Sequence, residues 1–252
     1  MKNKLWISLL SASILWSCHS PIVLSSVQPQ KNIAIASENA SDKTVEQTII
    51  PYKKALENQM NAKISHTEVE LTKQGDNSNL GNLLADYTLQ GARQWAAKNG
   101  LPITDASVIN IGGIRTSIGQ GDILLKHVYE VMPFENEVVI MKMSGKDLEG
   151  LFQYYLETQK NNPVSGFLIE TENKKITQAL INGAPINPNQ TYYIATSDYL
   201  AFGGDNMRFF SRGEMINTGI KLRDLFIEKF KENPEVKTPK DIRLIFKDKA
   251  QE

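Results

Sequence analysis

Residues 136–156 read NEVVIMKMSGKDLEGLFQYYL, an apolar run followed at once by a segment of mixed polarity. The first ten residues predict a β-strand, because they are rich in β-branched and long apolar side chains. The residues from about Lys146 to Leu156 predict a helix. Ser144 is a candidate N-cap for it, since a serine hydroxyl accepts from a free N–H of a first turn. A strand leading directly into a helix indicates that both kinds of element belong to one fold.

Other segments extend this pattern in both directions. Strands are predicted at 63–73 and near 106–115, two more within 175–200 joined through Asn182-Gly183 and a Pro-Asn turn, and a last one at 241–246. Helices are predicted at 77–100, which Gly100 closes, and after Thr218. Because strands and helices alternate irregularly, we expect an α+β fold, with a mixed β-sheet and packed helices, over residues 45–252.

The composition narrows the class of protein. The chain has 252 residues, with 28 basic and 28 acidic side chains. A nucleic-acid-binding protein would normally show a basic excess or a basic stripe, so we expect no nucleic-acid partner.

The N-terminal segment has the layout of an export signal. It begins MKNKLWISLLSASILWSC, with two lysines ahead of an apolar run that is too short for an ordinary membrane-spanning helix. Its end resembles the bacterial lipoprotein box, in which the cysteine is acylated. We therefore predict a lipoprotein signal over 1–18 with Cys18 lipidated, a flexible tether over 19–44, and an exported, periplasmic protein anchored to the membrane by lipid. The alternative is a plain cleaved signal peptide with an incidental cysteine.

Catalytic motifs are absent from the sequence. Histidine occurs only at positions 19, 66 and 127, without H-x-H or H-E-x-x-H spacing, and Cys18 belongs to the export segment. There is no G-x-S-x-G and no G-x-x-x-x-G-K-[ST]. Isolated histidines are usually packed or solvated, so we predict no catalytic residue, no metal ligand and no cofactor in this chain.

Three short stretches instead indicate ligand recognition: NIGGIR (110–115), MPFEN (132–136) and YLAFGGDNM (199–207). Arg115 suits carboxylate or phosphate oxygens, and Phe134 and Tyr199 could enclose a flat heterocycle. Asn136 could hold a polar end, and Asp205 could accept hydrogen bonds from ribose hydroxyls. Each stretch also has a purely structural interpretation, as a turn or as core.

Five motifs occur in the order seen in one family: GNLLAD (81–86), NIGGIR, PFEN (133–136), SGKDLEGLF (144–152) and TYYIATSDYLAFGGDNM (191–207). Over residues 45–250 the chain resembles the C-terminal, substrate-binding domain of the 5′-nucleotidase/UDP-sugar hydrolase family. The resemblance implies that Phe134 and Tyr199 stack on the nucleobase and that Asp205 binds ribose. It implies that Asn110 and Arg115 contact the nucleoside and its phosphate side, with Asn136 in the same motif.

The sequence departs from the family in three places. The D-x-H, N-H-E and H-x-H motifs of the metallophosphoesterase domain do not occur in it. Residues 73–76 read Lys-Gln-Gly-Asp where the family usually has arginine. After the Gly-Gly-Asp turn the family tends to have glycine and an aromatic residue, whereas this chain has Asn206 and Met207.

Three functions remain open. The first is the nucleotide-recognition part of a split periplasmic 5′-nucleotidase whose divalent metals belong to a separate metallophosphoesterase subunit. The second is a stand-alone nucleoside- or nucleotide-binding lipoprotein, and the third is a degenerate remnant. Alone, the chain is expected to be inactive as a hydrolase.

Overall fold

The structure, a computed structural model, describes residue 32 and residues 42–249. Cys18, the predicted signal segment and nearly all of the predicted tether lie outside these residues, so these assignments stay predictions. The chain divides into two units between Thr48 and Ile49, and helix α2 (Lys43–Met60), which the sequence did not predict, spans that boundary. No residue of α2 is buried. Within the described part, no helix is long and apolar enough to cross a membrane.

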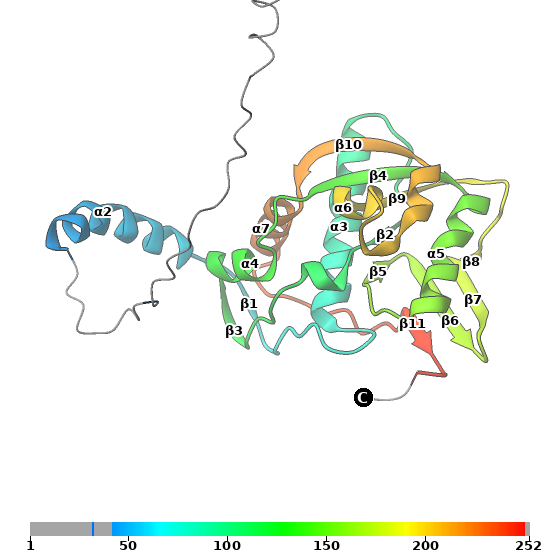
Figure 1. Cartoon of the computed structure of the whole chain (residues 1–252), viewed down its shortest axis with the longest axis horizontal. Helices are drawn as coiled ribbons and strands as arrows, with labels where there is room; N and C mark the ends of the chain where they lie inside the picture. The colour runs from blue at the N-terminus through cyan, green and yellow to red at the C-terminus, as the bar shows by residue number, and fades with distance from the viewer. Residues whose placement is uncertain (1–31, 33–41, 250–252) are drawn as a thin grey trace, which may run out of the picture. The chain divides into compact units, whose positions relative to one another are not determined.

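The second unit combines helices and strands throughout its length (Figure 1). Its further helices are α3 (Asn79–Lys98), α4 (Leu125–Val131), α5 (Gly145–Thr158), α6 (Asp198–Ala201) and α7 (Leu222–Glu232), with short 3₁₀ turns η1 (Ile111–Gly113), η2 (Gly204–Asn206) and η3 (Arg208–Arg212). Its strands are β1 (Lys63–Thr67), β2 (Ala106–Val108), β3 (Gly121–Leu124), β4 (Glu137–Ser144), β5 (Val164–Ser165), β6 (Phe167–Glu172), β7 (Lys175–Ile181), β8 (Ala184–Pro185), β9 (Thr191–Ser197), β10 (Glu214–Lys221) and β11 (Leu244–Phe246).

The strands form three sheets. The largest has the order β10-β4-β9-β2-β5, in which β2 and β9 are parallel and the other pairs are antiparallel. A second sheet has the order β11-β6-β7-β8, with β11 parallel to β6, and β1 pairs with β3 in a two-stranded sheet. The predicted α+β class with a mixed sheet is therefore confirmed.

Strand β4 explains the apolar run that opened the sequence analysis. Val138 and Ile140 belong to one buried cluster, whereas Val139 and Met141 belong to the other. Successive side chains of a strand point to opposite faces, so both faces of the large sheet are covered. A strand buried on both sides reads as a continuous apolar run.

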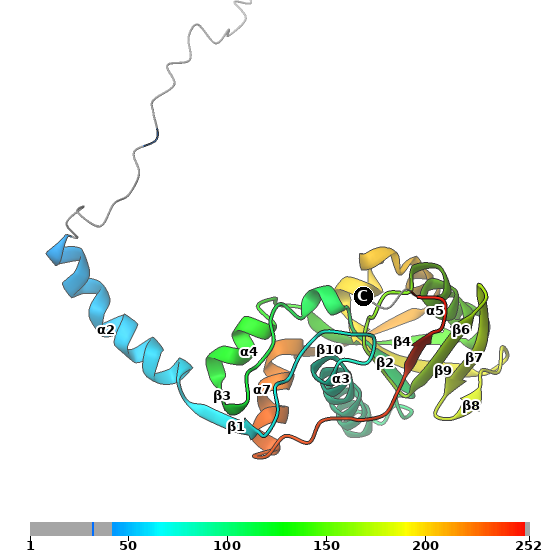
Figure 2. The same ribbon diagram turned by 90° about the horizontal axis from the view of Figure 1, so that it is seen from below.

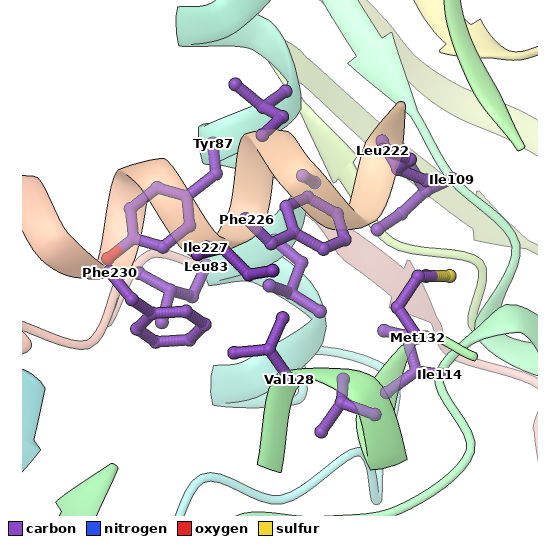
Figure 3. Close-up of a cluster of buried hydrophobic side chains, with 14 of the residues drawn as sticks. Leu83, Tyr87, Ile109, Ile114, Val128, Met132, Leu222, Phe226, Ile227 and Phe230 are labelled. Atoms are coloured by element: carbon purple, nitrogen blue, oxygen red, sulfur yellow. The ribbon is translucent and has the colours of Figure 1, made fainter. Parts of the chain in front are cut away.

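The first cluster lies among α3, α4, α7 and the large sheet (Figure 3). Tyr87 of α3 and Phe230 of α7 meet edge to face, with ring centroids 5.4 Å apart. Phe226 of α7 is fully buried in the same cluster. Full burial of each large side chain contributes roughly 1.5–3 kcal/mol. This cluster therefore fixes α7 against α3.

The second cluster joins α5 to the large sheet and to β6 and β7 (Figures 1 and 2). Ser144 caps α5 as predicted, because its hydroxyl accepts from the Asp147 N–H at 3.1 Å. Leu148 and Phe152 lie on the buried face of the helix. The segment that suggested the fold thus supplies both a central strand and the helix that covers it.

A buried arginine ties the last strand to the rest of the unit. Arg243 donates to the carbonyl oxygens of Asn82 (3.2 Å) and Val164 (2.8 Å), which belong to α3 and β5. It also donates to the carboxylates of Asp86 (2.9 Å) and Asp241 (2.7 Å). Its charge is thereby paired within the fold.

The pairing predicted for residues 175–200 is only half right. Asn182 and Gly183 both have positive φ, 49° and 79°, as a tight hairpin turn requires, and they connect β7 to β8. Strand β9 does not pair with either, because it lies between β4 and β2 in the other sheet. The strand predicted at 63–73 ends at Thr67, and β10 continues to Lys221 before α7 begins.

Candidate functional site

The topology of the large sheet brings three chain segments to one edge. Strands β2 and β9 are parallel, with Ala106 opposite Ile194, so both end at the same edge. Strand β4 is antiparallel to β9, with Val138 opposite Ser197, so it begins there. The residues that follow β2, precede β4 and follow β9 are consequently neighbours in space.

These segments enclose a cavity of about 420 Å³. It is lined by Asn110, Gly112, Arg115, Phe134, Asn136, Tyr199 and Asp205. All six residues that the sequence analysis proposed for ligand binding therefore meet at one place, together with Gly112 of the NIGGIR motif. That they bind a nucleotide stays a prediction.

Phe134 and Tyr199 line the cavity and belong to neither buried cluster. Each is 42% exposed, whereas Leu200, next to Tyr199, is completely buried. The core interpretation of Phe134 is thus wrong. The guanidinium of Arg115 lies 5.8 Å from the centroid of the Phe134 ring, within cation–π range.

Tyr199 and Asp205 are held as one unit. The Tyr199 hydroxyl donates to Asp205 Oδ1 at 3.0 Å and accepts from the Asp205 N–H at 3.2 Å. The hydrogen bond to Asp205 raises the pKa of Tyr199, since it favours the protonated phenol. Asp205 has φ 52°, in the left-handed region, and a Cβ on Gly204 would lie 2.5 Å from the tyrosine ring. The Gly-Gly-Asp turn is therefore shaped to let the ring approach its own loop.

Asp198, which the sequence analysis missed, orients two of the cavity residues. Its Oδ1 accepts from Asn136 Nδ2 at 2.9 Å and from the backbone N–H of Tyr199 at 2.7 Å. Because Asn136 donates through its nitrogen, its amide oxygen remains available to a ligand. Asp198 directly precedes Tyr199, but only the pairing of β4 with β9 brings it to Asn136.

A buried amide fixes the loop that carries Asn110. Asn162 accepts from the Ile111 N–H at 2.9 Å and donates to the Tyr154 hydroxyl at 3.0 Å, while its own carbonyl accepts from the Tyr155 hydroxyl at 2.7 Å. Asn162 is fully buried, so these bonds form without competing water. The sequence offered no signal for this role, because Asn162 lies in a loop outside every motif.

Two lysines border the site. Lys160 Nζ is 3.8 Å from Asp205 Oδ2. Lys73, in the stretch where the family usually has arginine, donates from Nζ to the Ile114 carbonyl at 2.7 Å. Lys73 thus supports the backbone next to Arg115, and it is not among the residues that line the cavity.

The lining residues combine two kinds of group. They offer two aromatic faces, one guanidinium, two amides and one carboxylate. The arrangement suits a ligand with a flat ring, hydroxyl groups and an anionic end.

Comparisons with known proteins agree with this fold. A trifunctional nucleotide phosphoesterase protein from Bacillus subtilis is 30% identical over 217 residues, which is 77% of this chain and 14% of that protein. A 5′-nucleotidase from Vibrio vulnificus is 28% identical over 222 residues, 82% of this chain and 37% of that one. The chain thus spans about a third or less of these relatives.

The crystal structure of a 5′-nucleotidase precursor from Thermus thermophilus has the same fold. It superposes with a TM-score of 0.69 at 24% identity, over 82% of this chain and 44% of that one. The profile of the family described as "5′-nucleotidase, C-terminal domain" matches residues 60–212, which hold the whole cavity lining. The chain belongs to the 5′-nucleotidase C-terminal domain family.

Proposed function

We propose that the chain is the nucleotide-recognition part of a 5′-nucleotidase. One observation carries the proposal: two exposed aromatic rings, a carboxylate, a guanidinium and two amides converge on a single cavity. Ligand pockets are typically lined by aromatic side chains together with a few convergent polar groups. A nucleotide matches this set of groups part by part.

In the proposed complex the base lies between Phe134 and Tyr199, and each stack contributes roughly 1–3 kcal/mol. Asp205 accepts hydrogen bonds from the ribose hydroxyls, and its carboxylate is oriented by the Tyr199 hydroxyl. Arg115 is directed to the phosphate side of the nucleotide, and Asn136 is directed to a polar edge of the nucleotide. Asn110, at the start of η1, contributes a further amide.

Hydrolysis is assigned to another polypeptide. Phosphate ester cleavage in two-metal enzymes depends on ions that activate water and stabilise the phosphoryl charge. The 252 residues contain none of the D-x-H, N-H-E or H-x-H motifs. In this proposal a separate metallophosphoesterase subunit completes the enzyme. A stand-alone nucleotide-binding protein would use the same cavity without that partner.

The proposed location is the periplasmic side of a membrane, with Cys18 lipidated. The 5′-nucleotidase from Thermus thermophilus is described as a precursor, which supports the proposal that this chain is exported. Two acyl chains anchor a protein stably in a membrane. A chain without a lipidated cysteine lacks the apolar surface that these acyl chains would bury in the bilayer. The Cys18→Ser variant should leave the membrane fraction, and its retention after a salt wash would contradict the lipoprotein assignment.

Isothermal titration of the full chain with AMP, adenosine and adenine tests the recognition proposal. The wild type should bind all three, and Phe134→Ala should weaken all three by about 5- to 150-fold, the equivalent of one stack. Phe202→Ala is the matched control, because Phe202 is 77% exposed in the same segment as Tyr199 but does not line the cavity. No binding at millimolar ligand, with the partner phosphoesterase present, would refute recognition.

A rate measurement separates recognition from catalysis. The purified chain with divalent metal should release no phosphate from AMP. Metal-dependent release that survives purification and is lost in Arg115→Ala would contradict the assignment of hydrolysis to another polypeptide.

A further inference from the structure

Three side chains with metal-binding atoms meet at a distance from the cavity. His66 belongs to β1, Glu68 follows the end of that strand, and Glu235 follows α7. One ligand atom from each lies within 4.8 Å of the others. Neither glutamate was singled out by the sequence analysis, and Glu235 could not be, because it is 169 positions from His66 along the chain.

The backbone brings these residues together in a defined register. His66 N–H donates to the Pro234 carbonyl at 2.9 Å, and the Val236 N–H donates to the His66 carbonyl at 2.8 Å. These bonds form a parallel bridge in which His66 is paired with Glu235. Glu68 lies in a bend directly after β1, and its Oε1 is 3.4 Å from His66 Nε2. The proximity of His66 and Glu235 is therefore imposed by main-chain pairing, whereas Glu68 joins them through its side chain.

The histidine ring is oriented by a carboxylate on the neighbouring strand. Asp122 of β3 is the cross-strand partner of His66, and its Oδ1 lies 2.8 Å from His66 Nδ1. Lys63 Nζ contacts the same oxygen at 2.7 Å. In the neutral tautomer that carries its proton on Nδ1, this proton is donated to Asp122 and the lone pair of Nε2 faces Glu68. Metal-binding histidines usually have this arrangement, in which one ring nitrogen binds the ion and the other donates to a carboxylate.

The distances agree with a small coordination sphere. His66 Nε2 and Glu68 Oε1 are 3.4 Å apart. Ligands held about 2.0–2.2 Å from Zn²⁺ in a tetrahedron are separated by roughly 3.3–3.6 Å. Glu68 and Glu235 are exposed, so their side chains can adjust to close the remaining distance.

We propose that His66 Nε2, Glu68 and Glu235 bind one divalent transition-metal ion of the Zn²⁺ class, with water in the remaining position. Imidazole together with carboxylate selects such ions over Mg²⁺ and Ca²⁺, which prefer oxygen ligands alone. The site would connect β1 to the segment after α7. It is independent of nucleotide recognition.

Titration calorimetry of the full chain with ZnCl₂ tests this proposal. The wild type should bind one ion through this site, and His66→Gln should weaken that binding at least 100-fold. Asp122→Asn removes only the orienting carboxylate and should weaken it 10- to 100-fold, as removal of such outer partners does elsewhere. With Co²⁺, the wild type should show the intense visible absorption of four-coordinate cobalt, and the His66→Gln variant should not.

Glu235→Gln is the decisive variant, because Glu235 joins the site only in the folded chain. Its side chain is exposed, so the variant should keep the wild-type melting temperature without metal and lose 10-fold or more in Zn²⁺ affinity. His127→Gln is the matched control and should bind as the wild type does. Absence of binding by the wild type, or equal affinity of wild type and Glu235→Gln, would overturn the proposal.

Discussion

Replacing Tyr199 with phenylalanine separates two roles that this side chain has in the proposed complex. The ring that faces the base is retained, whereas the hydroxyl that donates to Asp205 Oδ1 and accepts from the Asp205 N–H is lost. Asp205 then keeps its left-handed backbone conformation without either bond. We expect its carboxylate to lose its fixed orientation toward the ribose.

The size of the effect follows from these two contacts. A hydrogen bond to a charged group contributes about 1.5–3 kcal/mol when it is shielded from water. Tyr199 is 42% exposed, so about 1 kcal/mol is the appropriate figure here, which corresponds to roughly fivefold in affinity. Tyr199→Phe should therefore weaken adenosine and AMP about fivefold and leave adenine unchanged. Tyr199→Ala also removes the stack and should weaken all three ligands, adenine included.

The assay is a calorimetric titration of wild type and both variants with adenine, adenosine and AMP. Phe202→Ala serves again as the control for removal of an exposed ring. If Tyr199→Phe weakens adenine as much as adenosine, the hydroxyl acts on the base directly and the role assigned to Asp205 is wrong. If it changes none of the three, the pair does not orient the carboxylate.

Three further predictions concern the loop, the core and pH. Gly204→Ala should weaken adenine binding and lower the melting temperature, because the new Cβ would lie 2.5 Å from the ring of Tyr199 and 2.6 Å from its backbone carbonyl oxygen; unchanged adenine binding would contradict the role of the ring. Phe226→Ala should lower the free energy of unfolding, measured with urea, by about 3–5 kcal/mol, because the ring is fully buried; a loss below 1 kcal/mol would contradict the assigned core. Hydrogen bonds from Arg243 hold the pKa of Asp241 below its ordinary value. This carboxylate therefore stabilises the fold above its ordinary pKa and ceases to do so as the pH falls through the lowered pKa. The stability difference between wild type and Asp241→Asn should therefore be constant at neutral pH and disappear in acid; a difference that persists there would refute the pairing.

The cavity residues could be predicted because each lies in a short motif of distinctive composition. Tyr199 and Asp205 are six positions apart, so their proximity is nearly a local property. The hydroxyl–carboxylate contact could not be predicted, because it depends on the positive φ of Asp205 and on the missing Cβ of Gly204. Asp198 was missed for a different reason, since its partner Asn136 becomes a neighbour only through sheet pairing.

The fold class followed from strong elements, although the 18-residue helix α2 was not predicted. Strand β5 has only two residues, too few for a periodic signal, and it exists because β2 pairs with it. Strand β9 alternates clearly, but nothing in its own residues distinguishes pairing with β7 from pairing with β4. The contact between His66 and Glu235 is likewise long-range, so spacing along the sequence could not indicate it.

Arg243 and β11 complete contacts with segments that are synthesised much earlier. The carbonyl of Val164 and the carboxylate of Asp86 are made long before the arginine that pairs with them leaves the ribosome. Until then β6 has an open edge and the second cluster lacks Leu244 and Phe246. Domains fold as units once their contacts are present, so the second cluster is complete only after Phe246 has been made. For the exported protein proposed above, that delay keeps residues 49–246 threadable through a translocation pore while they are being made.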